Sequence, residues 1–192
     1  MGRQSAPIQK FVHAYAHTQR QTPAANMDRD GQDEVIFAIS YYFDREQYSD
    51  PAAFSDLDVD VNTKKYVAGG VAAFDVLSGK MKWHTHLDLT TDETLYRAYI
   101  YSSPTVADID NDGKLEVILG TSLGFLYVLD HTGSVKPGWP VTMAEIQGQV
   151  AVGDVNDDGQ LELVATDNRF NVAVFNWKGE EVWEKRISGF SA

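Results

Sequence analysis

Three copies of one acidic segment recur along the chain, and this repetition constrains the fold more than any other feature of the sequence. The copies are residues 26–34, 108–116 and 154–162. In each copy the fifth and sixth residues are Asp-Gly and the ninth is Glu. A short repeated unit cannot bury its apolar face alone, so neighbouring units are expected to stack on one another.

The residues around the acidic segment repeat with it. Each copy is followed by an apolar run rich in β-branched residues, a second such run, a turn with glycine and a segment with tryptophan. In chain order these are Val35–Ile39, Gly70–Asp75, Gly79 and Trp83; Val117–Gly120, Phe125–Asp130, Gly133 and Trp139; Leu163–Thr166, Asn171–Asn176, Gly179 and Trp183. Candidate first strands precede the second and third copies, at Pro104–Ala107 and Gln149–Val152. Four short strands per unit predict an all-β fold of β-propeller type.

We expect one repeat domain over residues 1–192, made of about three four-stranded blades with an acidic loop between the first and second strands of each. The blades are predicted at 11–95, with an insertion at 44–66, and at 96–144 and 145–190. A closed propeller usually has at least about four blades. The sequence therefore predicts a partial propeller, part of a longer protein, with further blades supplied by the same or another chain.

Two sets of residues are assigned to packing. The tryptophans of the closing segments are expected to dock each blade on the next, because their place in the unit is constant. Several glycines are expected in tight turns or where the chain is crowded near a propeller axis. They are Gly69, Gly70, Gly120 and Gly124.

The acidic loops carry the chemistry. Oxygen-bearing side chains at positions 1, 3 and 5, with glycine at position 6, are typical of a site for a hard cation such as Ca²⁺. The EF-hand is excluded, since it needs a glutamate at position 12 and a helix after the loop. Position 12 is Phe37, Leu119 or Ala165, and a strand-like run follows each loop. Glu at position 9 is the alternative closing ligand.

This spacing predicts up to three calcium sites. The predicted side-chain ligands are Asn26, Asp28, Asp30 and Glu34; Asp108, Asp110, Asp112 and Glu116; and Asp154, Asn156, Asp158 and Glu162. The backbone carbonyls of Gln32, Lys114 and Gln160 are expected to complete them, while Asp33 and Asp157 point away. The second loop offers four carboxylates and is expected to bind tightest.

The pattern D-x-[DN]-x-D-G-x-x-E followed by a strand resembles the calcium loops of FG-GAP (VCBS) repeats, as in the integrin α-subunit propeller. The stretches Arg97–Val106, Met143–Gly148 and Phe11–His13 are similar to plant FG-GAP proteins of the "defective in exine formation" type. The resemblance spans about Phe11 to Ser188. It implies a calcium-binding adhesion scaffold of the secretory pathway, plasma membrane or extracellular space, acting in cell-wall (exine) patterning on a protein or glycan ligand.

Charge limits the partners. The chain has 28 acidic and 16 basic residues, a formal net charge of −12, and twelve of the acids lie in the three loops. Nucleic acid and anionic membrane surfaces would repel it, so neither is an expected partner of this segment. The absence of cysteine excludes disulfides and thiol chemistry.

Two alternatives to a binding scaffold stay open. One is a purely structural unit that calcium makes rigid within a larger protein. The other is a propeller scaffold of a quinone- or glycan-acting enzyme, because Phe74–Trp83 and Val174–Trp183 also resemble quinoprotein blades. That shared signature concerns packing, and the sequence contains no G-x-S-x-G, H-E-x-x-H or phosphate-loop motif. We therefore expect no enzymatic activity.

Three further groups are noted as weaker candidates for metal binding. His84 and His86 alternate on one strand face, where a solvated edge is the simpler interpretation. His13 and His17 have helical ligand spacing in a segment that reads as strand. The run Asp56–Asn62 places an oxygen ligand at every second residue of the insertion, without the glycine of the repeated loops.

Overall fold

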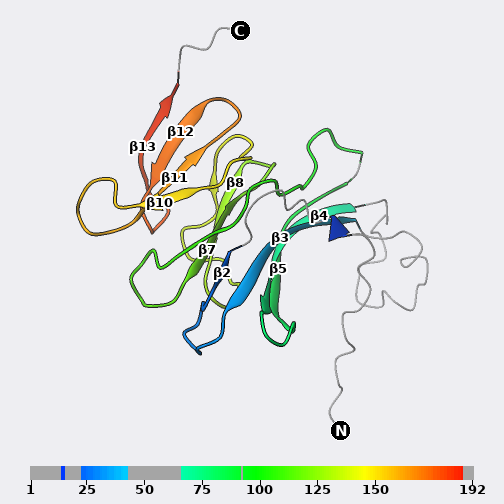
Figure 1. Ribbon diagram of the computed structural model, residues 1–192. Coiled ribbons are helices and arrows are strands. Elements are labelled where there is room, and N and C mark those ends of the chain that lie inside the picture. The colour runs from blue at the N-terminus through cyan, green and yellow to red at the C-terminus, as the bar shows by residue number, and fades with distance from the viewer. Residues whose placement is uncertain (1–13, 16–22, 43–65, 92, 188–192) are drawn as a thin grey trace.

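The structure is a computed structural model that describes residues 14–15, 23–42, 66–91 and 93–187. Within these residues the chain forms thirteen β-strands and no helix, which confirms the all-β class. The strands make three antiparallel sheets that follow one another in chain order (Figure 1). We call these sheets blades 1, 2 and 3.

Blade 1 contains the five strands β1 (Ala14–Tyr15), β2 (Ala24–Ala25), β3 (Glu34–Tyr42), β4 (Tyr66–Asp75) and β5 (Met81–Thr91). Both short strands, β1 and β2, pair with the same edge of β3, so the sheet is four strands wide. The pairing of β3 with β4 runs from Glu34–Asp75 to Tyr42–Val67, on either side of the predicted insertion.

Blades 2 and 3 are four-stranded meanders. Blade 2 contains β6 (Thr105–Ala107), β7 (Glu116–Gly120), β8 (Phe125–Leu129) and β9 (Val141–Thr142). Blade 3 contains β10 (Ala151–Gly153), β11 (Glu162–Thr166), β12 (Asn171–Phe175) and β13 (Glu181–Arg186). In both sheets each strand pairs with the next one in the chain, as the repeat predicted.

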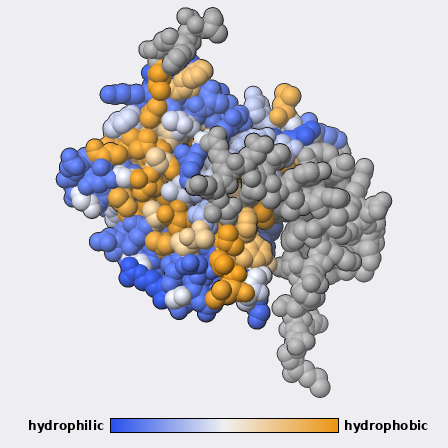
Figure 2. All heavy atoms as spheres, viewed as in Figure 1, coloured by the Kyte–Doolittle hydropathy of each residue, from blue (hydrophilic) through white to orange (hydrophobic). Residues whose placement is uncertain are grey.

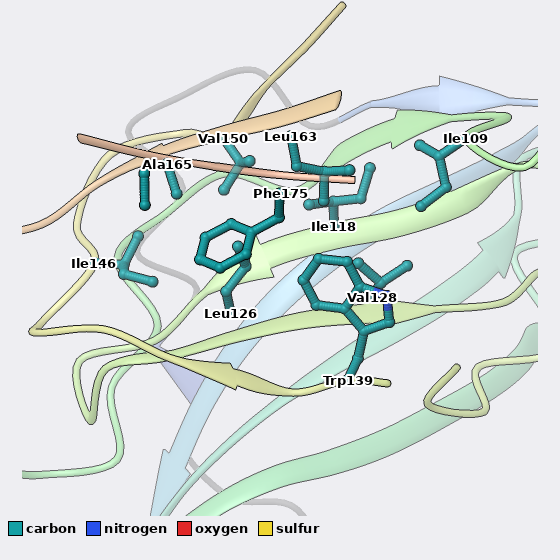
Figure 3. Close-up of a cluster of buried hydrophobic side chains, with 11 residues drawn as sticks. Ile109, Ile118, Leu126, Val128, Trp139, Ile146, Val150, Leu163, Ala165 and Phe175 are labelled. Carbon is teal, nitrogen blue, oxygen red and sulfur yellow. The ribbon is translucent and has the colours of Figure 1, made fainter. Parts of the chain in front are cut away.

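Blade 2 is buried on both faces. Successive side chains of a strand point to opposite faces, and β7 uses this alternation fully. Val117 and Leu119 pack with blade 1, whereas Ile118 packs with blade 3. The cluster between blades 2 and 3 includes Trp139 and Phe175, whose ring centroids are 6.2 Å apart (Figure 3). Continuous apolar runs such as 117–119 are therefore double-sided strands and not amphipathic ones.

The tryptophans dock successive blades. Trp83 of blade 1 donates a hydrogen bond from Nε1 to the carbonyl of His131 in blade 2, at 2.9 Å. Trp139 of blade 2 donates in the same way to the carbonyl of Trp177 in blade 3, at 3.3 Å. Two of the three predicted docking contacts are thus confirmed. Trp183 of blade 3 is 40% exposed, and no described residue plays the acceptor role for it.

The closing segment of blade 2 differs from the prediction. Four strands per unit place the fourth strand at the tryptophan segment, but in blade 2 the fourth strand begins only at Val141, after Trp139. Proline has no N–H and cannot donate to a sheet ladder, and Pro137 and Pro140 stand on either side of Trp139. Trp139 reaches blade 3 from a turn instead of from a strand.

The expected crowding at glycine is confirmed at three positions. A Cβ at Gly120 would lie 2.1 Å from Cγ2 of Ile146, and one at Gly70 would lie 2.6 Å from the carbonyl oxygen of Thr85. Gly69 is crowded by the carbonyl of Ala98 in the same way. Gly124 has a φ of 85°, as a turn requires.

Among the coloured residues of Figure 2, polar residues lie along much of the left-hand and lower edge, and hydrophobic residues lie between them. The described residues contain no helix with the length and apolarity needed to cross a bilayer.

Candidate cation sites

The three acidic loops share one backbone conformation. Loop one (26–34), loop two (108–116) and loop three (154–162) each connect the first and second strands of a blade, as predicted. In each loop φ is positive at the glycine in sixth position and also at the non-glycine residue in fourth position. These residues are Arg29 (62°), Asn111 (59°) and Asp157 (60°), and Gly31 (91°), Gly113 (92°) and Gly159 (84°). Two left-handed residues in one short loop make the sharp turn that a cation loop requires.

The glutamate in ninth position closes each loop in the same way. Its Oε2 accepts a hydrogen bond from the backbone N–H of the second loop residue. The pairs are Met27 and Glu34 (2.9 Å), Ile109 and Glu116 (3.0 Å), and Val155 and Glu162 (3.0 Å). All three glutamates are buried. The bond fixes each carboxylate and leaves its second oxygen, Oε1, on the inner side of the loop.

The aspartates at positions 3 and 5 also use one carboxylate oxygen to accept a hydrogen bond from a backbone N–H. In loop one, Oδ1 of Asp28 accepts from the N–H of Asp30 (3.2 Å), and Oδ1 of Asp30 accepts from that of Gln32 (2.8 Å). Asp110 and Asp112 make the corresponding bonds in loop two, at 3.2 and 2.7 Å. One oxygen of each carboxylate therefore shapes the loop, and the other remains for a cation.

Two loops gather their carboxylates. Oxygens of Asp28, Asp30 and Glu34 lie within 4.8 Å of one another in loop one, as do those of Asp108, Asp110 and Glu116 in loop two. At the first position of the same loops, Oδ1 of Asn26 and Oδ1 of Asp108 are buried without a hydrogen-bond partner. An oxygen shielded from water needs a partner, and a cation held by the group would supply one.

Not every predicted ligand joins these groups. Asp112 is outside the group of loop two, and within the described part of the chain loop three forms no comparable group. In loop three the Nδ2 of Asn156 donates to Asp158 Oδ2 (3.1 Å) and to Glu162 Oε1 (3.5 Å). Asn156 therefore presents an N–H donor at the third loop position, where Asp28 and Asp110 present a carboxylate oxygen. The carbonyl ligands at Gln32, Lys114 and Gln160, like the calcium ions themselves, stay predictions.

Two lysines that the loop spacing does not point to enter the carboxylate groups. Lys82 Nζ lies 3.1 Å from Asp28 Oδ2, 3.0 Å from Asp30 Oδ2 and 2.5 Å from Glu34 Oε1. In loop two, Lys136 Nζ lies 2.5 Å from Asp110 Oδ2 and 3.1 Å from Glu116 Oε1. The oxygens that each ammonium contacts are those left over by the backbone bonds.

The two lysines occupy equivalent places in their blades. In blade 1 Phe74 pairs with Met81 and Ala73 with Trp83, so Lys82 is the extra residue of a β-bulge. In blade 2, Lys136 follows Val135, which forms the equivalent bridge to Leu129. A bulge redirects its side chain out of the strand's alternation, and here it directs the lysine into the loop.

Blade 3 lacks this lysine. Phe175 pairs with Glu181 and Val174 with Trp183, which makes Val182 the bulge residue. Val182 is 50% exposed. Lys82 directly precedes Trp83 in the sequence, whereas two residues separate Lys136 from Trp139. Because the spacing differs, the sequence alone does not show that the two lysines occupy equivalent positions.

Electrostatics of the groups follow from burial and pairing. The hydrogen bond with Glu34 is the main cause that raises the pKa of Lys82 above its ordinary value. Burial opposes the protonated form of Lys136, but its bonds with Asp110 and Glu116 still raise its pKa. Burial raises the pKa of Glu116, despite the bonds from Ile109 and Lys136. These ammonium groups stay charged at neutral pH.

Loops one and two touch each other. The N–H of Leu115 donates to the carbonyl of Met27 at 3.0 Å. The guanidinium of Arg29 lies over Gly113, where a Cβ would come within 2.5 Å of Nη1. The fourth residue of one loop thus rests on the sixth residue of the next.

Other features of the described region are distinct from the loops. The rings of His84 and His86 contact each other edge to face, with centroids 5.1 Å apart, and burial lowers the pKa of His86. His13, His17 and the run Asp56–Asn62 lie outside the described residues.

A cavity of about 490 Å³ lies between the end of β5 and blade 2. It is lined by Glu93, Thr94, Leu95, Tyr96, Arg97, Tyr99, Tyr101, Ser122 and Glu145.

Comparison with known proteins relates the chain to others by fold. No protein-family profile and no curated protein matches it. The V. cholerae biofilm matrix protein Bap1 is 19% identical over 84% of the chain, with a TM-score of 0.50. BamB from Moraxella catarrhalis is 19% identical over 68% (TM-score 0.47), and BBS1N, solved in complex with ARL6DN, is 12% identical over 93% (TM-score 0.47). The chain spans 23% of Bap1, 37% of BamB and 61% of BBS1N. At such low identity, the likeness to Bap1 concerns the fold alone.

Proposed function

We propose that this chain is a calcium-binding segment of a β-propeller that serves as a binding scaffold. Loops one and two are its principal cation sites, and loop three is a further site of lower carboxylate density. The observation that carries the proposal is the inward set of carboxylate oxygens in loops one and two. Calcium is the ion that best suits flexible cages of protein oxygens.

The buried oxygens in first position add an independent argument. Asn26 Oδ1 and Asp108 Oδ1 are buried without a hydrogen-bond partner; Asp108 is a member of the group of loop two, and Asn26 holds the equivalent first position of loop one. Burial of an unpaired polar atom costs roughly 1–3 kcal/mol. A metal ion bound in each loop would give these oxygens a partner, whereas Lys82 and Lys136 make no hydrogen bond to either of them.

The wider role rests on the FG-GAP resemblance. We assign the chain to the calcium-loop propellers of that type, as an adhesion scaffold of the secretory pathway, plasma membrane or extracellular space. A role in patterning the plant cell wall is part of the same proposal. The ligand would be a protein or a glycan, and the cavity lined by Tyr96, Tyr99 and Tyr101 is the candidate surface, because aromatic rings beside charged groups suit both ligand classes.

A further blade is the partner proposed for blade 3. Trp83 and Trp139 each dock on the turn of the following blade, at the carbonyl after an Asp or Asn residue. Trp183 occupies the same place and is exposed together with Val182. Continuing the series requires another turn of the same kind, from the same or another chain.

Calorimetric titration of the chain with CaCl₂ tests the cation sites. We expect binding in the range of roughly 10⁻⁴ to 10⁻³ M, typical of extracellular calcium modules, and weaker binding of Mg²⁺. Glu34→Gln and Glu116→Gln should each remove one site, because they remove an inward oxygen charge. Asp33→Asn is the matched control, since Asp33 is exposed and outside the group of loop one. Absence of binding at millimolar calcium would overturn the proposal.

A second experiment separates a scaffold from a purely structural unit. The chain is immobilised and exposed to cell-wall glycans and to extracellular proteins, with calcium or with EGTA. Retention in calcium and release by EGTA supports a binding scaffold. A large gain in stability with no retained partner would instead support the structural unit.

A further inference from the structure

Loops one and two each contain the ammonium group of a lysine side chain. The ammonium of Lys82 contacts three oxygens of loop one, and that of Lys136 contacts two oxygens of loop two. Both lysines come from the bulge position of the fourth-strand segment, far from the loops in sequence. The groups of loops one and two thus each combine three carboxylates with one ammonium.

We propose that Lys82 and Lys136 are displaceable internal cations, so that calcium enters each loop only as the ammonium leaves. This inference rests on the proposed calcium function and assigns the regulation of the same sites. No covalent bond is made or broken in the exchange: the lysine stays protonated and moves to solvent, and Ca²⁺ coordinates the carboxylate oxygens that the ammonium leaves.

Geometry makes the two occupants mutually exclusive. The ammonium contacts Asp28 Oδ2, Asp30 Oδ2 and Glu34 Oε1, which are the oxygens that the backbone bonds leave for a metal. A calcium ion binds such oxygens at about 2.3–2.6 Å. It would then lie within a few ångströms of Nζ, where two positive charges repel strongly in a partly buried site.

The exposure of the lysines predicts an order of exchange. The side chain of Lys82 is 27% exposed, whereas that of Lys136 is 15% exposed. A long flexible side chain can keep its stem in place while its head turns to water. Lys82 has the shorter path to solvent, so loop one should exchange its ammonium more readily than loop two.

The exchange gives the lysines a role in the calcium-free state. Without any cation, the buried Glu34 and Glu116 would face other carboxylates with their charges uncompensated, which is strongly unfavourable. The ammonium groups keep these loops folded without calcium and thereby weaken the apparent affinity for the ion. Loop three has Val182 at the bulge and uses the amide of Asn156 instead.

The test compares Lys82→Met and Lys136→Met with Lys80→Met. Methionine keeps most of the lysine stem without its charge, and Lys80 is an exposed lysine in the turn next to the bulge. Calcium titration of Lys82→Met should show about tenfold tighter binding at loop one, equivalent to removing about 1.4 kcal/mol of competition. Lys136→Met should tighten loop two, and Lys80→Met should leave both sites unchanged. Unchanged or weaker binding in the two bulge variants would overturn the exchange.

A measurement on the unaltered chain covers the case in which a variant fails to fold. Lysines are acetylated briefly with acetic anhydride, with and without calcium, and each site is quantified by mass spectrometry. Modification of Lys82 and Lys136 should rise severalfold in calcium, while that of Lys80 stays constant. If calcium binds and their reactivity does not change, the exchange is wrong although the sites are real. If calcium binds to neither the chain nor its variants, the proposed function itself fails.

Discussion

The indole ring of Trp83 lies directly on the backbone of Gly133 in the neighbouring blade. A Cβ placed on Gly133 would lie 2.5 Å from Cε3 of the ring, and Nε1 of the same ring donates to the carbonyl of His131. The contact couples a ring from one repeat to the tight turn of the next. It explains why a glycine and a tryptophan recur together in the unit, since each requires the other across the blade interface.

Gly133→Ala should therefore be strongly destabilising. Its φ of 84° already disfavours a side chain by about 1 kcal/mol, and the clash with Trp83 adds about 1–3 kcal/mol. Gly79→Ala is the control, because Gly79 has a φ of 65° in the equivalent turn of blade 1 and a Cβ added there would meet no atom within 4 Å. Urea unfolding of both variants should show a larger loss for Gly133→Ala. Equal losses would contradict a role for the ring contact.

Trp139 and Trp183 should differ sharply in their contribution to stability. Trp139 is buried in the cluster between blades 2 and 3, so Trp139→Ala should cost about 3–5 kcal/mol in free energy of unfolding. Trp183 is half-exposed on the outer blade, and Trp183→Ala should cost less than about 1 kcal/mol. Chemical denaturation of the two variants checks the contrast. A comparable loss at Trp183 would show that its face is already covered.

Asp88 should be a destabilising carboxylate at neutral pH. It is buried, its Oδ1 accepts from the hydroxyl of Tyr127 at 3.0 Å, its Oδ2 is unpaired, and burial raises its pKa. Since the folded-state pKa exceeds the unfolded value of about 3.9, stability falls as pH rises between the two. Asp88→Asn should raise the free energy of unfolding by about 1 kcal/mol at pH 7. The gain should vanish below about pH 4, where the original carboxyl is protonated in both states.

The pKa of Asp130 is shifted in the opposite direction to that of Asp88. Burial alone would raise its pKa, but its bonds from Thr132 and Ser134 lower it overall. Its stabilisation is present above the unfolded pKa of about 3.9 and is lost as pH falls through the folded value. Asp130→Asn should therefore be destabilising at pH 7, and its cost should shrink as pH falls below about 3.9. Unfolding curves at pH 7 should show a gain in free energy of unfolding for Asp88→Asn and a loss for Asp130→Asn.

Chelation should lower the thermal stability of the chain. An ion that binds only the folded state, at ten times its dissociation constant, adds about 1.4 kcal/mol for each site. The melting temperature should rise on addition of 10 mM CaCl₂ and return to its starting value with EGTA. In the double variant Glu34→Gln/Glu116→Gln most of this shift should disappear. A full shift in that variant would place the stabilising ion elsewhere.

The sequence predicted the order of the strands and the place of the loops because both depend on short-range patterns. Val117–Gly120 could be recognised as strand from its composition, and Asp-Gly marked the turn in each loop. Neither pattern contains the register across a blade. The bulge that directs Lys82 at Glu34 arises from the pairing of Ala73 with Trp83, which only the folded sheet fixes.

The ligand sets were predicted in part for a similar reason. Spacing placed Asp28, Asp30 and Glu34 on the inner side of one loop, and the structure brings them together. Spacing could not show that Asn156 would direct its Nδ2 inward, since Asn and Asp occupy the same volume and differ only in what they donate.

The contact of Arg29 with Gly113 has a consequence for how ions fill the loops. It joins the turn of loop one to that of loop two, and the bond from Leu115 to Met27 ties their backbones. An ion that fixes the geometry of one loop therefore also restrains the geometry of the other. Calcium binding to this pair should be cooperative, with a Hill coefficient above one. Arg29→Ala should reduce that coefficient towards one without removing a ligand.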